Sequence, residues 1–142
     1  MKYFSYLIFL SILSLVSCEP QFIEEPIPYV PVDIEVNLSN PQFITLDTYG
    51  YAYLNSEGVR GIIIRRTSNN TYRAYERNCS FAPYDACATV DVHPSGQYMV
   101  DTCCSSIFDW FGQPIGGPAI FPLLEYNTIL SGTFLRIYNN EL

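Results

Sequence analysis

The hydrophobic residues of the chain lie in short runs separated by turn residues. From about residue 32 onward, β-branched and aromatic residues dominate these runs, and no segment repeats apolar residues with the period of an amphipathic helix. Such side chains pack well on a pleated surface. The pattern therefore predicts strands over residues 32–38, 43–46, 51–54, 61–65, 72–76, 89–92, 97–100, 106–109, 123–126 and 133–138.

The segments between these runs carry the chemistry of tight turns. They include Asn40-Pro41, Glu57-Gly58, Pro94-Ser95-Gly96, Gly116-Gly117-Pro118 and Ser131-Gly132, in which proline presets φ and glycine allows positive φ. The sequence contains no internal repeat and no low-complexity segment. We therefore expect an all-β fold, a single antiparallel β-sandwich or barrel.

Composition excludes several classes of function. The chain has 142 residues, 49% of them hydrophobic, with 14 acidic against 7 basic residues and a net charge of −7. An acidic surface does not bind phosphate backbones, so we expect no nucleic-acid partner. The sequence has one histidine, His93, so any site that needs two imidazoles is excluded.

The N-terminus has the pattern of an export signal. Lys2 precedes an apolar run over residues 6–16, which is too short to span a bilayer comfortably and ends at the small Ser17. The four residues 15–18, Leu-Val-Ser-Cys, resemble the lipobox of bacterial lipoproteins, in which the cysteine is lipidated and becomes the new N-terminus. We therefore interpret residues 1–17 as a lipoprotein signal peptide and Cys18 as the lipidation site. The expected location is the exported side of a bacterial membrane in the cell envelope, with the outer membrane favoured.

Residues 18–32 have the composition of a tether. Four prolines and two adjacent glutamates lie within this stretch, and proline at that density favours extended polyproline II. The part of the chain after the signal contains no lysine, so we expect the lipid, and not a basic patch, to hold the membrane. Residues 33–142 form the predicted domain.

Four cysteines remain in this domain: Cys79, Cys87, Cys103 and Cys104. An even number in a small exported β domain favours two disulfides, with three possible pairings. Adjacent Cys103 and Cys104 are poor partners for each other, which leaves two pairings open. In a strand these two side chains would point to opposite faces. A zinc site would need all four sulfurs at one ion, which this arrangement opposes, so we expect no metal.

One stretch of the domain resembles a known family. Residues 101–109, Asp-Thr-Cys-Cys-Ser-Ser-Ile-Phe-Asp, are followed by Gly112 and by Gly-Pro-Ala at 117–119. This order resembles the second half of a Rieske domain, which reads C-P-C-H-G-S-x-F-D, then glycine, then G-P-A. Residues 61–65 and 72–81 are similar to the strands that lead into the family's first loop, C-T-H. The resemblance covers about residues 33–138 and implies a Rieske-like β-sandwich with a small loop subdomain at one tip.

The departures from this pattern affect the iron–sulfur ligands. The resemblance puts four residues at the family's ligand positions: Cys79, Phe81, Asp101 and Cys104. Of these, Cys79 alone keeps the family's ligand type, whereas a Rieske [2Fe–2S] cluster requires two cysteines and two histidines. His93 lies in a predicted turn and supplies one imidazole where two are needed. We therefore expect that the cluster is absent and that the domain binds no cofactor.

The resemblance also implies a disulfide pairing. Many Rieske domains join their two cluster loops by a disulfide. Cys103 falls on the second-loop cysteine of that disulfide. Cys87, a cysteine of the first loop, is the partner that the resemblance implies for Cys103. Cys79 and Cys104, at two former ligand positions, form the implied second bridge. The alternative pairing, Cys79 with Cys103 and Cys87 with Cys104, stays open.

The function that these features favour is a binding or structural role. Trp110 and Phe111 precede Gly112 in a predicted turn, where exposed aromatic side chains can contact a partner. They can equally fold back over the disulfides and fill space. The alternative function is electron transfer by a [2Fe–2S] cluster on atypical ligands such as Cys79, Cys87, Cys103 and Cys104. No feature of the sequence demands an enzyme.

Overall fold

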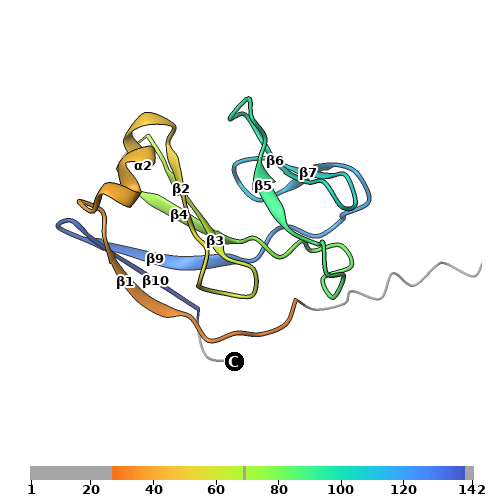
Figure 1. Cartoon of the computed structure of the whole chain (residues 1–142), viewed down its shortest axis with the longest axis horizontal. Coiled ribbons are helices and arrows are strands. Elements are labelled where there is room, and N and C mark those ends of the chain that lie inside the picture. The colour runs from red at the N-terminus through yellow and green to blue at the C-terminus, as the bar shows by residue number, and fades with distance from the viewer. Residues whose placement is uncertain (1–26, 69, 140–142) are drawn as a thin grey trace, which may run out of the picture.

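The computed structural model describes residues 27–68 and 70–139. Two antiparallel sheets form two lobes, which Figure 1 shows side by side. The larger sheet has the strand order β1-β10-β9-β4-β3-β2, and the smaller has the order β5-β6-β7-β8. Because β5 to β8 fall between β4 and β9 along the chain, the small lobe is an insertion into the larger sheet. The predicted all-β class is confirmed.

The larger lobe contains six strands and a short helical segment. Strand β10 illustrates the period-2 pattern of this lobe, because Leu135 and Ile137 are buried while Phe134 and Arg136 are exposed. The bounds of the elements are β1 Asp33–Asn37, η1 Pro41–Phe43, α2 Ile44–Thr48, β2 Tyr51–Leu54, β3 Ile62–Arg66, β4 Tyr72–Glu76, β9 Glu125–Ser131 and β10 Phe134–Tyr138.

The small lobe is built from four short strands. They are β5 Val90–Val92, β6 Met99–Asp101, β7 Ser106–Phe108 and β8 Pro114–Gly116. Their buried residues pack with Tyr75 of the larger sheet and with Cys79 in one core, which includes Val90, Met99 and Phe108.

Strand β3 lies between the two cores. Its three isoleucines are fully buried: Ile62 and Ile64 pack into the core of the larger lobe, and Ile63 packs into the core that continues into the small lobe. A strand covered on both faces reads as a continuous apolar run, which explains why the sequence shows no alternation here. Burial of each such side chain contributes about 1.5–3 kcal/mol to stability.

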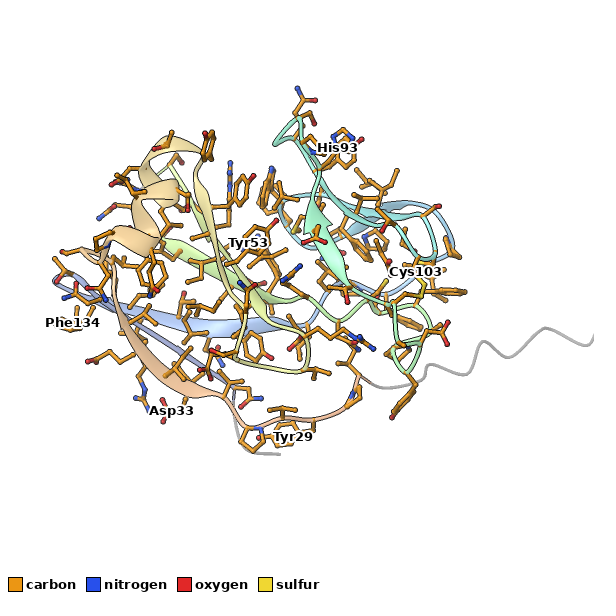
Figure 2. The ribbon with its side chains drawn as sticks, in the orientation of Figure 1. Tyr29, Asp33, Tyr53, His93, Cys103 and Phe134 are labelled. Atoms are coloured by element: carbon orange, nitrogen blue, oxygen red, sulfur yellow. A yellow bond between two sulfur atoms is a disulfide. The ribbon has the colours of Figure 1, made fainter. Side chains whose placement is uncertain are left out.

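Side-chain hydrogen bonds hold the lobes together. The backbone N–H of Val92 donates to the hydroxyl of Tyr53 at 3.0 Å, and Figure 2 shows Tyr53 between the two lobes. The hydroxyl of Tyr75 donates to the carbonyl of Trp110 at 3.0 Å. Arg77 donates to the carbonyl of Val90 at 3.1 Å and to Asn55 Oδ1 at 3.0 Å. These bonds give the small lobe a defined position on the larger sheet.

Three elements of the structure differ from the prediction. The strand predicted over residues 43–46 is the end of η1 and the start of α2, because Phe43 and Leu46 are both buried three residues apart while Ile44 is 66% exposed. Pro41 occupies the first helical turn, where its missing N–H costs nothing. Strand β8 was missed, since it is three residues long and begins with proline. The strand predicted over residues 123–126 is instead β9, Glu125–Ser131, because pairing with β10 extends it through residues 127–131.

The end of the predicted tether packs on the domain. Asn139 accepts a hydrogen bond from the backbone N–H of Val32 at 2.9 Å and donates one to the carbonyl of Val30 at 2.8 Å. Val32 itself is buried. The rest of the signal and tether, residues 1–26 with Cys18, lies outside the described residues. Across the described ranges, the helices are far too short to span a bilayer.

Candidate functional site

Three loops meet at one end of the small sheet. The first loop is residues 77–89, the second is residues 102–105, and the third is residues 117–124. A disulfide joins the first loop to the second. The hydroxyl of Ser80 in the first loop donates to the carbonyl of Phe121 in the third at 2.7 Å. The backbone N–H of Ala119 in the third loop donates to Ser106 Oγ, beside the second, at 3.1 Å. Each loop is therefore fixed by the others.

The disulfide links Cys87 to Cys103, the pair that the resemblance implied. Their Cα atoms are 5.6 Å apart and the two residues are separated by 16 positions in the sequence. Closing a loop of this length stabilises the folded state by about 3 kcal/mol through the entropy of the unfolded chain. The bridge thus ties the first loop to the second.

Cys79 and Cys104 are close together but are not bonded. Their sulfurs are 3.8 Å apart and both side chains are free thiols. The second implied bridge therefore stays a prediction. Cys79 is fully buried, whereas Cys104 is half-buried. Burial raises the pKa of the Cys79 thiol well above its ordinary value of 9.0, against a hydrogen bond from the backbone of Phe81 that lowers it.

Asp101 completes a cluster with these two thiols. One donor atom from each of Cys79, Asp101 and Cys104 lies within 4.8 Å of the other two. Asp101 is fully buried. Its Oδ1 accepts a hydrogen bond from the backbone N–H of Cys103 at 2.7 Å, and its Oδ2 accepts one from Cys104 Sγ at 3.3 Å.

A tight turn brings these residues together. Strand β6 ends at Asp101, and the backbone N–H of Ser105 returns to the carbonyl of Asp101 at 2.8 Å. Cys103 and Cys104 thus lie in a turn, not in the strand that the sequence argument assumed. The expectation of opposite strand faces is therefore wrong in its premise, although the two sulfurs still point to different partners.

Two other predicted positions lie away from the cluster or lack a donor. Phe81 is 41% exposed and offers no ligand atom. His93 lies in the β5–β6 hairpin, where its ring stacks on Tyr98 with centroids 4.3 Å apart and its Nδ1 is 2.9 Å from Ser95 Oγ. Figure 2 shows His93 and Cys103 at separate places in the small lobe.

The aromatic pair before Gly112 consists of one half-buried and one exposed side chain. Trp110 is half-buried, with its ring 5.8 Å from that of Tyr51 and 4.2 Å from the guanidinium of Arg65. Its indole N–H donates to the carbonyl of Gly96 at 3.1 Å. Phe111 is 67% exposed. Of the two, Phe111 has the surface that a partner contact needs.

Sequence reasoning missed two contributors to this site. The metal argument counted sulfurs alone and so overlooked the carboxylate of Asp101, which it had placed at a former ligand position. Ser106 was also missed: its Oγ lies 3.0 Å from Cys104 Sγ and holds the third loop through Ala119. The sequence did contain a signal for Ser106, because it aligns with the serine of the Rieske pattern.

The overall architecture is that of a Rieske domain. No family model matches the chain, and no similar protein was found among curated sequences. Among solved structures, the chain is similar to the cyanobacterial plasma membrane Rieske protein PetC3 from Synechocystis PCC 6803, with a TM-score of 0.55 and 20% identity. The match covers 78% of this chain and 100% of that one. This similarity confirms the Rieske-like fold.

Proposed function

We propose that this chain is a lipid-anchored protein of the bacterial envelope whose Rieske-like domain has lost its [2Fe–2S] cluster and serves as a binding or structural module. The ligand positions carry this proposal. A Rieske cluster takes two thiolates and two imidazoles. Phe81 has no donor atom at one of these positions, and the single histidine, His93, lies in a distant hairpin.

The remaining cysteines do not make up the deficit. Cys87 and Cys103 are consumed by their disulfide, which leaves two thiols and one carboxylate at the loops. The residues present do not fit a four-ligand cluster.

The protein's own contacts brace the three loops. The Cys87–Cys103 bridge and the Ser80–Phe121 hydrogen bond connect the three loops directly. Arg60, from the loop between β2 and β3, donates to the carbonyls of Asp85 and Ala86 at 2.5 and 2.7 Å. These bonds attach the first loop to the larger lobe. This framework supports a structural role for the small lobe.

Anchoring rests on the lipobox-like residues before Cys18 and on the proline-rich segment after it. The similar PetC3 protein is described as a plasma membrane protein, which agrees with a membrane location. The exposed ring of Phe111 is a candidate contact for an envelope protein partner.

Iron and sulfide content tests the loss of the cluster against the electron-transfer alternative. The protein purified from envelopes should be colourless, without stoichiometric iron or acid-labile sulfide. A variant with the family's ligands restored, Phe81→His, Asp101→Cys and Cys104→His together, is the positive control for cluster assembly and detection. A wild-type protein with two irons and two sulfides per chain would overturn the proposal and establish electron transfer.

A further inference from the structure

The three loops are joined by the disulfide and by the hydrogen bonds of Ser80 and Ala119, so their connection does not use the thiols of Cys79 and Cys104. Two thiols and a carboxylate are brought from β6 and from two different loops into one place. Asp101 and Cys79 are fully buried and Cys104 is half-buried. We propose that these three residues form a mononuclear Zn²⁺ site.

The distances match those of zinc ligands. Zinc binds thiolate at about 2.3 Å in tetrahedral geometry, which places two coordinated sulfurs about 3.8 Å apart. The sulfurs of Cys79 and Cys104 are 3.8 Å apart. A thiolate and a carboxylate oxygen on the same ion would be about 3.5 Å apart, and Cys104 Sγ lies 3.3 Å from Asp101 Oδ2. Two of the three donor pairs therefore already have the spacing of bound ligands, and the third pair, Cys79 with Asp101, lies within 4.8 Å.

The buried carboxylate of Asp101 favours binding of a cation at this site. This carboxylate is fully buried, and in the described part of the chain it forms no ion pair with an arginine or histidine. Buried carboxylates usually pair with a cation or ligate a metal. Zinc entry would release the two thiol protons to solvent, so that one dication replaces two protons and the net charge of the site is unchanged.

The donor set selects the metal. Thiolates exclude magnesium and calcium, which prefer oxygen ligands, and the carboxylate disfavours copper(I), which prefers sulfur. Zinc accepts both donors in a tetrahedral site. With three protein ligands, the fourth position is left for water or a small ligand.

The zinc site rests on the proposed loss of the [2Fe–2S] cluster, because that cluster would bind the same side-chain atoms. It also competes with the implied Cys79–Cys104 disulfide, which would consume both ligand sulfurs.

The first test is the metal content of the full-length protein isolated from envelopes without chelator or reductant. We expect one zinc per chain. After the metal is removed with a chelator, Co²⁺ should restore a one-to-one complex with thiolate charge-transfer absorption, and Zn²⁺ should displace it. Zinc should also protect Cys104 from alkylation.

Variants separate this site from adventitious binding. Asp101→Asn and Cys104→Ser should each weaken zinc binding by roughly 10- to 100-fold or more, as measured by competition with a chelating dye. Asp85→Asn, an exposed carboxylate of the first loop, is the matched control and should bind like the wild type. Circular dichroism of each variant checks that the fold is retained.

The outcomes are distinct. Metal-free protein with a Cys79–Cys104 disulfide in the peptide map would overturn the zinc site and leave the proposed function intact. Equal zinc affinity in Asp101→Asn and wild type would overturn it as well. Stoichiometric iron with labile sulfide would overturn both the zinc site and the proposed function.

Discussion

The hydroxyl of Tyr126 in β9 donates a 2.7 Å hydrogen bond to Oε2 of Glu76 at the end of β4, with both side chains buried. The same carboxylate accepts the backbone N–H groups of Val59, Arg60 and Asn78 at 2.7 to 2.9 Å. A buried carboxylate is tolerated when such donors surround it. Since Asn78 directly precedes Cys79, this network also fixes the start of the first loop.

Tyr126→Phe should therefore destabilise the domain by about 1.5–3 kcal/mol, because it removes a hydrogen bond to a buried charge. The measurement is the free energy of unfolding from urea denaturation. Tyr49→Phe is the matched control, since Tyr49 is exposed, and it should unfold like the wild type. Equal stability of the two variants would show that the Tyr126 hydroxyl contributes nothing.

Stability should fall as the pH rises above about 9. Burial raises the pKa of Cys79, Tyr75 and Tyr126 in the folded protein above the ordinary values of 9.0 for cysteine and 10.0 for tyrosine. Above these values the unfolded chain loses protons that the folded chain keeps, so the slope of the unfolding free energy with pH is negative. The contribution of these groups to the unfolding free energy is fully present below pH 9 and is lost progressively above it. Each group contributes about 1.4 kcal/mol per pH unit.

Thermal unfolding of the metal-free protein at pH 7, 9, 10 and 11 measures this effect. The fall in Tm between pH 10 and 11 should be smaller in Tyr126→Phe than in the wild type, because one of the groups with a raised pKa has been removed. A wild-type Tm that stays level to pH 11 would contradict the prediction.

The Cys87–Cys103 bridge should stabilise the domain measurably. The double variant Cys87→Ser with Cys103→Ser should lose about 2–4 kcal/mol of unfolding free energy. The wild type unfolded under non-reducing conditions is the reference, and peptide mapping checks that the bridge is present in it. An unchanged denaturation midpoint would mean that the loops are held by other contacts.

The close approach of Gly117 to the second loop predicts a sensitive position. Gly117 has φ of +80°, and a Cβ there would lie 2.4 Å from the carbonyl oxygen of Ser105. Gly96 has a similar φ of +70° with open space around it. Gly96→Ala should cost about 1–2 kcal/mol for the left-handed backbone alone, and Gly117→Ala should cost a further 1–3 kcal/mol or so for the clash. Equal losses in chemical denaturation would contradict the tight packing of the third loop.

Cys18→Ala should release the domain from the membrane or arrest signal processing, because the acyl chains have no other attachment point in the lipobox pattern. Membrane fractionation and the mass of the N-terminal peptide measure the result. Cys104→Ala, a cysteine of the domain, is the control and should remain with the membrane. A Cys18→Ala protein that matures normally and still sediments with membranes would refute the lipid anchor.

Local pattern and order along the chain were enough for the fold class. Strand prediction succeeded where neighbouring strands impose a period of two, as in β10, or bury both faces, as in β3. The motif over residues 101–109 with Gly-Pro-Ala after it pointed to the Rieske-like architecture and to Cys87 beside Cys103. Strand prediction failed at residues 43–46. There the burial of Phe43 and Leu46 depends on a helix that packs over the sheet, and the local sequence pattern does not reveal that packing.

The sequence by itself thus determined the all-β class, and it predicted export and a departure from the Rieske ligand pattern, since these depend on residue identity and spacing. Only the tertiary structure decided that Cys79, Asp101 and Cys104 share one place while His93 lies elsewhere. It also decided that Trp110 is half-buried against Tyr51 while Phe111 is exposed. The reason is physical: distances between side chains from different loops are set by how the loops close on each other, through a disulfide, a buried serine hydroxyl and a glycine with no room for a Cβ. Sequence spacing does not encode those contacts.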